Sequence, residues 1–212
     1  MRTNDLINAL AADAGRESIS LGKAATIALI GGAAVTATIF FVAIGMRADI
    51  AQALHSIRFL FKFAVVLALG IPAAVVAMRL GRPGTVIGQW GWALVLAPVL
   101  LVLGVLVELA TVSKLQWPTN LVGPNWQYCV TVIPMLAAAP LAGILFALRY
   151  GAPTNGPLAG AAAGIAAASI AAAFYASHCP DDSPLFVATS YPIAIGIVAL
   201  FGSLIGKRML RW

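Results

Sequence analysis

The chain has 212 residues, of which 61% are hydrophobic and only 9% are charged, and its net charge is +6. A soluble domain is roughly 45–50% apolar and about 25% charged, so the composition excludes a soluble domain and indicates a protein embedded mostly in lipid. The basic residues stand singly at the ends of apolar runs, which is typical of topology determinants and argues against nucleic-acid binding.

Residues 1–23 precede the first apolar run and are expected to form a cytoplasmic segment. Leu6 and Leu10 recur at helical spacing, with Asp5 and Asp13 on the flanks, which predicts a short amphipathic helix. A helix that binds anionic lipid is rich in Lys and Arg, whereas this one is acidic, so it favours a protein partner. The alternative is a solvated tail.

Six apolar runs are each long enough to cross a bilayer as a helix, because about 20 residues suffice. They cover approximately residues 24–45, 59–79, 86–108, 128–149, 156–176 and 185–206. The predicted fold class is therefore an all-α integral membrane protein, with a six-transmembrane-helix bundle over residues 24–212. Lys62 lies inside the second run, and we expect its ammonium group to snorkel to the membrane interface.

Small residues in the fifth run indicate how the helices pack. Gly156, Gly160 and Gly164 recur every four residues, and small residues at this spacing let helix backbones approach closely. The pattern predicts that the fifth run is the central helix of the bundle. Packing within one chain is the favoured interpretation, and a homodimer seam is the alternative.

The distribution of Lys and Arg predicts the orientation. Nine of them fall on the side of the two termini and four on the other side, and basic residues concentrate in cytoplasmic loops. Both termini are therefore expected in the cytoplasm. The loop between the fifth and sixth runs is expected on the periplasmic or extracellular face.

The predicted membrane-spanning runs contain few residues that could transfer protons or catalyse a reaction. The runs are nearly free of the ionisable residues that a proton relay requires. The sequence also has no phosphate-binding G-x-x-x-x-G-K-[ST], no H-E-x-x-H and no G-x-S-x-G. An enzyme is therefore disfavoured.

The loop after the fifth run, "SHCPDDSPLFV" at residues 177–187, concentrates the remaining chemistry. Cys179 lies in it, and Cys129 at the start of the fourth run is expected at the same membrane boundary. Three interpretations of the two cysteines remain open. The first is structural, either a disulfide or two buried thiols, and the second is a redox switch. The third is a soft-metal site for Cu(I) or Zn, formed by Cys129, His178 and Cys179 with Asp181 or Asp182. The absence of C-x-x-C argues against a metal site and against a disulfide-generating oxidoreductase.

Helix-start signals follow in the same loop. Ser183 or Asp182 is expected to cap the sixth helix, with Pro184 at its first position.

The string "DLINALAADA" at 5–14, the six runs, the cysteine before the fourth run and above all "HCPDDSPLFVATSYP" at 178–192 resemble the NrsF-type anti-sigma factors. These are negative regulators of an extracytoplasmic-function (ECF) sigma factor. The resemblance covers essentially the whole chain, with one departure at Ser190, where a tryptophan is expected before the tyrosine.

The resemblance implies a bacterial inner-membrane protein that holds a sigma factor inactive. It also implies that Cys129 and Cys179 are the stress-sensing pair and that the segment with Asp5, Leu6, Leu10 and Asp13 contacts the sigma factor. No cofactor is expected unless the thiols bind copper or zinc. Two other functions remain open: a small transporter or channel for a metal or small solute, which needs a polar path, and an envelope thiol oxidoreductase.

Overall fold

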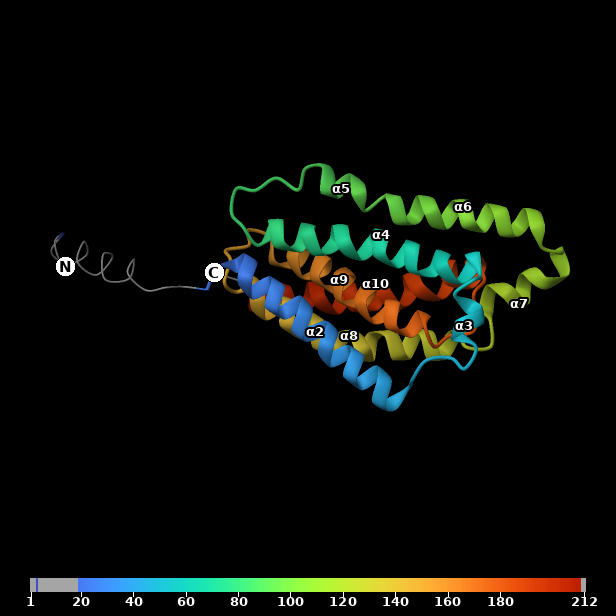
Figure 1. Cartoon of the computed structure of the whole chain (residues 1–212). Coiled ribbons are helices and arrows are strands. Elements are labelled where there is room, and N and C mark those ends of the chain that lie inside the picture. Colours follow the sequence, from blue (N-terminus) through green and yellow to red (C-terminus); the bar gives the residue numbers. More distant parts are fainter. Residues whose placement is uncertain (1–2, 4–18, 211–212) are drawn as a thin grey trace.

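A computed structural model describes residue 3 and residues 19–210, and the regular structure in this part is helical (Figure 1). The long helices are α2 (Leu21–Ala43), α4 (Ile57–Leu80), α6 (Leu96–Thr111), α8 (Trp126–Leu148), α9 (Gly156–Ala176) and α10 (Pro184–Met209). Short elements join them: α3 (Ile50–Ala53), α5 (Gln89–Ala93), the 3₁₀ helix η1 (Lys114–Gln116) and α7 (Trp117–Val122). The predicted acidic N-terminal helix, with Asp5, Leu6, Leu10 and Asp13, lies outside the described residues.

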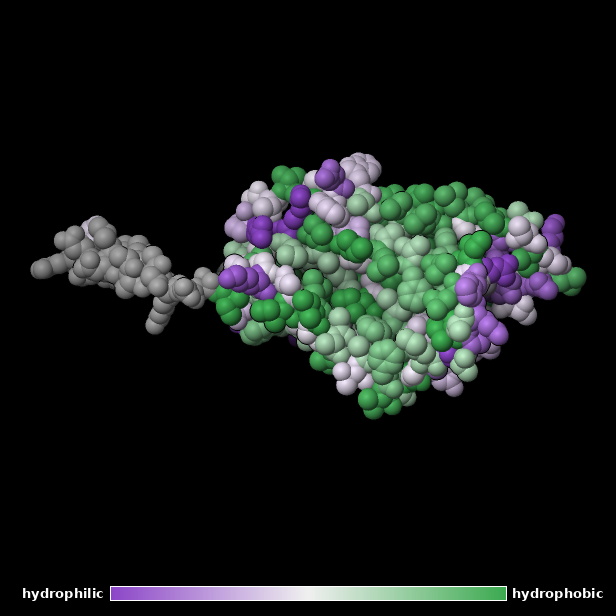
Figure 2. Space-filling view, viewed as in Figure 1, coloured by the Kyte–Doolittle hydropathy of each residue, from purple (hydrophilic) through white to green (hydrophobic). Residues whose placement is uncertain are grey.

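Six helical segments in the described part are long and apolar enough to cross a membrane. Hydrophobic side chains cover the middle of the molecule and hydrophilic ones gather at its two ends (Figure 2). This arrangement is that of a multi-pass membrane protein, as the composition predicts.

The third predicted span differs from a single straight helix. It begins at Gln89 and is interrupted between α5 and α6, around Leu94 and Val95. Pro98 explains the interruption, because proline has no N–H to donate to the carbonyl of Leu94 four residues earlier. The expected run 86–108 therefore forms two helices.

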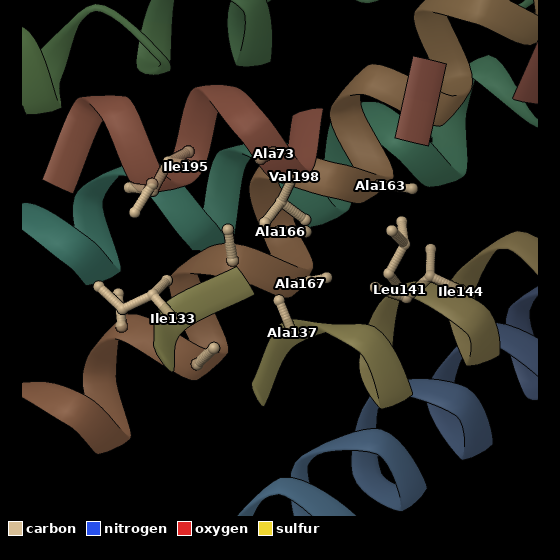
Figure 3. Close-up of a cluster of buried hydrophobic side chains, with 14 of the residues drawn as sticks. Ala73, Ile133, Ala137, Leu141, Ile144, Ala163, Ala166, Ala167, Ile195 and Val198 are labelled. Atoms are coloured by element: carbon tan, nitrogen blue, oxygen red, sulfur yellow. The ribbon is translucent and has the colours of Figure 1, made fainter. Parts of the chain in front are cut away.

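Helix α9 is the centre of the bundle, as predicted. It contacts α4, α8 and α10, and to a lesser extent α2. Its small side chains, such as Ala163, Ala166 and Ala167, are buried against larger ones from α8 and α10, including Ile133 and Val198 (Figure 3). Because alanine has almost no side-chain bulk, four neighbouring helices can approach one backbone.

The glycine repeat brings α9 and α10 into backbone contact. A methyl group added to Gly160 would overlap the carbonyl oxygen of Gly202, and one added to Gly156 would lie 2.7 Å from the carbonyl oxygen of Gly206. The small residues therefore serve packing within the chain, which was the favoured interpretation.

The bundle has two polar ends. At one end α9 meets α10, and α3, α7 and the start of α8 lie nearby (Figure 1). We call this the Cys179 end, and we call residues 177–183, which join α9 to α10, the Cys179 loop. Helix α10 ends at the opposite end, with Lys207 and Arg208 in its last turn.

Candidate functional site

The Cys179 loop begins and ends with local hydrogen bonds. The backbone N–H of Cys179 donates to the carbonyl of Tyr175 at 3.0 Å, which continues the last turn of α9. At the other side, the Ser183 hydroxyl accepts from the N–H of Leu185 at 3.2 Å, and Pro184 occupies the first turn of α10. The predicted capping by Ser183 is therefore confirmed, and the loop is fixed at both of its ends.

The two cysteines meet although 50 positions separate them. Cys129 lies in the first turn of α8 and Cys179 in the loop, and both are free thiols buried from solvent. A hydrogen bond from the Cys129 thiol holds the pKa of Cys179 below its ordinary value of 9.0; burial opposes this shift, and the positive charge of Lys62 adds to it. Within this pair, the thiolate form is thus favoured at Cys179.

Lys62 is fully buried, so the expectation that it snorkels to the interface is wrong. Its ammonium Nζ lies 2.6 Å from Asp182 Oδ1 and donates to the carbonyl of Cys179 at 2.9 Å. A second carbonyl, that of Asp181, lies 3.5 Å away. Burying an ammonium group costs several kcal/mol unless its charge and its N–H groups are matched, and this loop provides both.

Arg47 approaches the same loop from the connection between α2 and α3. Its Nη1 lies 2.9 Å from Asp182 Oδ2, and its backbone N–H donates to the carbonyl of Ser177 at 3.2 Å. Its Nε pairs with Asp49 at 2.6 Å. The hydrogen bond from Arg47 lowers the pKa of Asp49, so this carboxylate remains charged. Asp182 therefore bridges two cations from two different elements.

Glu108 forms a second ionic contact near the end of α6. Its carboxylate is 2% exposed and pairs with Arg58 Nη2 at 3.1 Å. The hydroxyl of Ser183 donates to Glu108 Oε1 at 3.1 Å, and the amide of Asn120 does so at 3.3 Å. Glu108, which lies in α6, thus connects Arg58 of α4 and Asn120 of α7 to Ser183, the N-cap residue of α10. We call the contacts of Lys62, Arg47 and Glu108 with residues 177–183 the ionic network.

The other predicted ligands face different partners. His178 Nδ1 lies 2.9 Å from the carbonyl of Gly45. Asp181 accepts from the amide of Asn125 at 3.1 Å, and Asp182 is held by the two cations described above. Within residues 19–210, no three His, Cys, Asp or Glu side chains gather as a metal site would require. The thiols come together, whereas the predicted metal ligands do not converge on them.

Sequence reasoning missed the ionic network. A signal is present in the sequence, because Lys62 interrupts an apolar run and Glu108 is an acid at the end of another. The position of a charge along the chain, however, does not show which charges pair.

The fold and the site together define a helical, multi-pass membrane protein with a buried thiol pair at one polar end. The chain belongs to the NrsF family, described as negative regulator of sigma F, whose model matches residues 10–212. This is a family of regulatory proteins rather than enzymes.

Two curated relatives align with this chain over the full length of both proteins. The anti-sigma-F factor NrsF of Caulobacter vibrioides is 34% identical over 217 residues. The probable anti-sigma-F factor NrsF of Azospira oryzae is 33% identical over 214 residues. No solved structure matches the chain. The resemblance drawn from the sequence is therefore confirmed at the level of the family.

Proposed function

We propose that this chain is an inner-membrane anti-sigma factor that holds an ECF sigma factor inactive and releases it when Cys129 and Cys179 are oxidised. The relatives named above support the anti-sigma role, and a sigma factor is the partner that their names imply. The observation that carries the sensing part is the contact between two free, buried thiols, that of Cys129 in the first turn of α8 and that of Cys179 in the charged loop.

The proposed orientation places the Cys179 end in the periplasm and both termini in the cytoplasm. The excess of Lys and Arg on the side of the termini supports it. In this orientation the thiols lie in an oxidising compartment, where disulfides persist. The N-terminal segment with Asp5, Leu6, Leu10 and Asp13 then lies on the side where a sigma factor acts, and it is our candidate for the contact.

A peroxide illustrates the oxidation. The Cys179 thiolate attacks one peroxide oxygen, the O–O bond breaks, and the hydroxide that leaves takes up a proton to become water. The product is a sulfenic acid on Cys179. The thiol of Cys129 then loses its proton and attacks this sulfur, the S–S bond forms, and the sulfenic oxygen leaves as water. Two thiols lose two electrons in total, and one hydrogen peroxide becomes two waters.

The new bond must change the packing at the Cys179 end to have an effect on the sigma factor. A signal shifts an equilibrium only by its differential free energy for the two states. A hundredfold loss of sigma affinity requires about 2.7 kcal/mol of coupling between the disulfide and the surface that binds the sigma factor.

Co-purification tests the proposal. The full chain in detergent should retain an ECF sigma factor, lose it when residues 1–14 are deleted, and release it when hydrogen peroxide is added. Cys129→Ser and Cys179→Ser should retain the sigma factor in peroxide. Failure to retain any sigma factor would overturn the anti-sigma role, and normal release by both serine variants would overturn the sensing role.

A further inference from the structure

A pocket of about 320 Å³ lies beside the thiol pair at the Cys179 end. The end of α2 forms one wall, with Ala43; the other is formed by Asn125, the N-cap residue of α8, and by Val132 near the start of that helix. Tyr175 and His178 line it from the end of α9 and from the Cys179 loop. Its polar groups are therefore amide, phenol and imidazole, surrounded by aliphatic side chains.

The pocket is next to the thiols because its lining residues flank them in the chain. Val132 follows Cys129 by three residues, about one turn of α8, and Asn125, the N-cap residue of α8, precedes Cys129 by four. Tyr175, whose carbonyl holds the backbone of Cys179, is 2% exposed and has its side chain against Cys129. The phenol of Tyr175 thus lines the pocket and also lies against the thiol of Cys129.

A second pocket, of about 360 Å³, lies on the other side of the Cys179 loop, and its lining is different. Arg58, Asp181 and Asp182 line it, together with Thr119. These charged groups already bind one another or the loop. Among the described residues, the first pocket is lined by no Asp, Glu, Lys or Arg; His178 lines it, and the Nδ1 of His178 faces the carbonyl of Gly45. Only an uncharged molecule enters such a lining without a large desolvation penalty.

From this geometry we infer that the pocket between α2 and α8 is the access and binding site of the oxidant, a small uncharged peroxide, and that Tyr175 is the gate through which it reaches Cys129 and Cys179. The inference rests on the proposed oxidation of this thiol pair, and it identifies the class of molecule that carries the signal. Since both thiols are buried, a route of this kind decides which oxidants react.

Filling each pocket in turn tests the inference. Val132→Trp fills the pocket from α8, and Ala43→Trp fills it from α2, in case the first variant does not fold. Thr119→Trp is the matched control, because it places the same bulk in the pocket on the other side of the loop. The full chain in detergent is treated with hydrogen peroxide, quenched with N-ethylmaleimide, and the Cys129–Cys179 disulfide is counted by mass spectrometry.

We expect either pocket-filling variant to lower the second-order rate constant of oxidation by about tenfold or more, because thiol oxidation follows access, and the control to leave it unchanged. In the unsubstituted chain, the neutral reagent methyl methanethiosulfonate should modify the thiols faster than its cationic trimethylammonium-ethyl analogue. Equal rates in all variants, or a slow reaction in Thr119→Trp alone, would overturn the inference.

The readout is independent of the sigma factor, so the two proposals fail separately. If the pocket controls oxidation but the oxidised chain retains the sigma factor, the sensing role fails and the access site stands. If peroxide releases the sigma factor from Val132→Trp and Ala43→Trp as fast as from the unsubstituted chain, the access site fails and the sensing role stands.

Discussion

Replacing Lys62 with methionine should destabilise the protein strongly. Methionine keeps the length of the side chain but removes the charge that faces Asp182 at 2.6 Å and the donor to the Cys179 carbonyl at 2.9 Å. Removing one partner of a buried ion pair costs about 3–5 kcal/mol, because the other charge is left without compensation. The side chain of Asp182 is 18% exposed and keeps Arg47 at 2.9 Å, so we expect the lower value, about 3 kcal/mol.

Equilibrium unfolding in mixed detergent micelles measures this loss. Lys114→Met is the control, since Lys114 is exposed at the same end of the bundle and surface substitutions change stability by about 0.5 kcal/mol or less. A double-mutant cycle with Asp182→Asn isolates the pair, and coupling of about 1–3 kcal/mol is expected for groups in contact. If Lys62→Met costs no more than Lys114→Met, or if the cycle is additive, the assignment of Lys62 to a buried ion pair is wrong.

Two further predictions concern helix packing and the thiols. Gly160→Ala should lower the unfolding free energy of the bundle by about 2 kcal/mol or more, because the added methyl group overlaps the backbone of Gly202 and overpacks the interface. Gly196→Ala is the control, because its methyl group enters open space and should leave the unfolding free energy unchanged. Equal unfolding midpoints of the two variants in detergent would contradict the packing of α9 on α10. The rate of alkylation of Cys179 by iodoacetamide should reach half its maximum below pH 9.0, because the lowered pKa of Cys179 makes its thiolate available at lower pH. Cys129→Ala removes the hydrogen bond to Cys179 and should raise the pH of half-maximal alkylation. An unchanged pH of half-maximal alkylation would show that Cys129 does not stabilise the thiolate.

The sequence predicted those features that depend on one chain segment at a time. Spanning helices follow from runs of apolar residues, so their number and approximate bounds could be read directly. The start of α10 at Pro184 follows from the serine before it, and the central place of α9 follows from its glycine and alanine content. Counting the helices between Cys129 and Cys179 placed both residues at the same membrane boundary, but the count alone did not predict that they meet.

The features that it did not predict depend on how helix faces turn toward one another. Snorkelling is the expected behaviour of a lysine near a helix end in lipid, but Lys62 faces the Cys179 loop, where Asp182 binds it. The position of a residue in a run does not reveal that face. His178 likewise lies beside Cys179 in the chain but contacts Gly45, because neighbours in a loop point in different directions.

The ionic network explains how a bond between two sulfur atoms could act on the far end of the bundle in the proposed mechanism. Lys62 holds the Cys179 loop to α4, and Arg47 holds it to the segment that follows α2. The attraction within a buried ion pair offsets the cost of removing its charges from water only when the geometry is good. A partly displaced pair is therefore unfavourable, so the loop either keeps these contacts or loses them completely. Such contacts give two discrete arrangements rather than a gradual deformation. Because α2 runs from this end back to Leu21, next to the segment proposed to bind the sigma factor, one helix joins the loop to that segment. The free energy released by oxidation is then divided between breaking the network and moving α2, so a weaker network would make the sigma factor dissociate in response to a weaker oxidant.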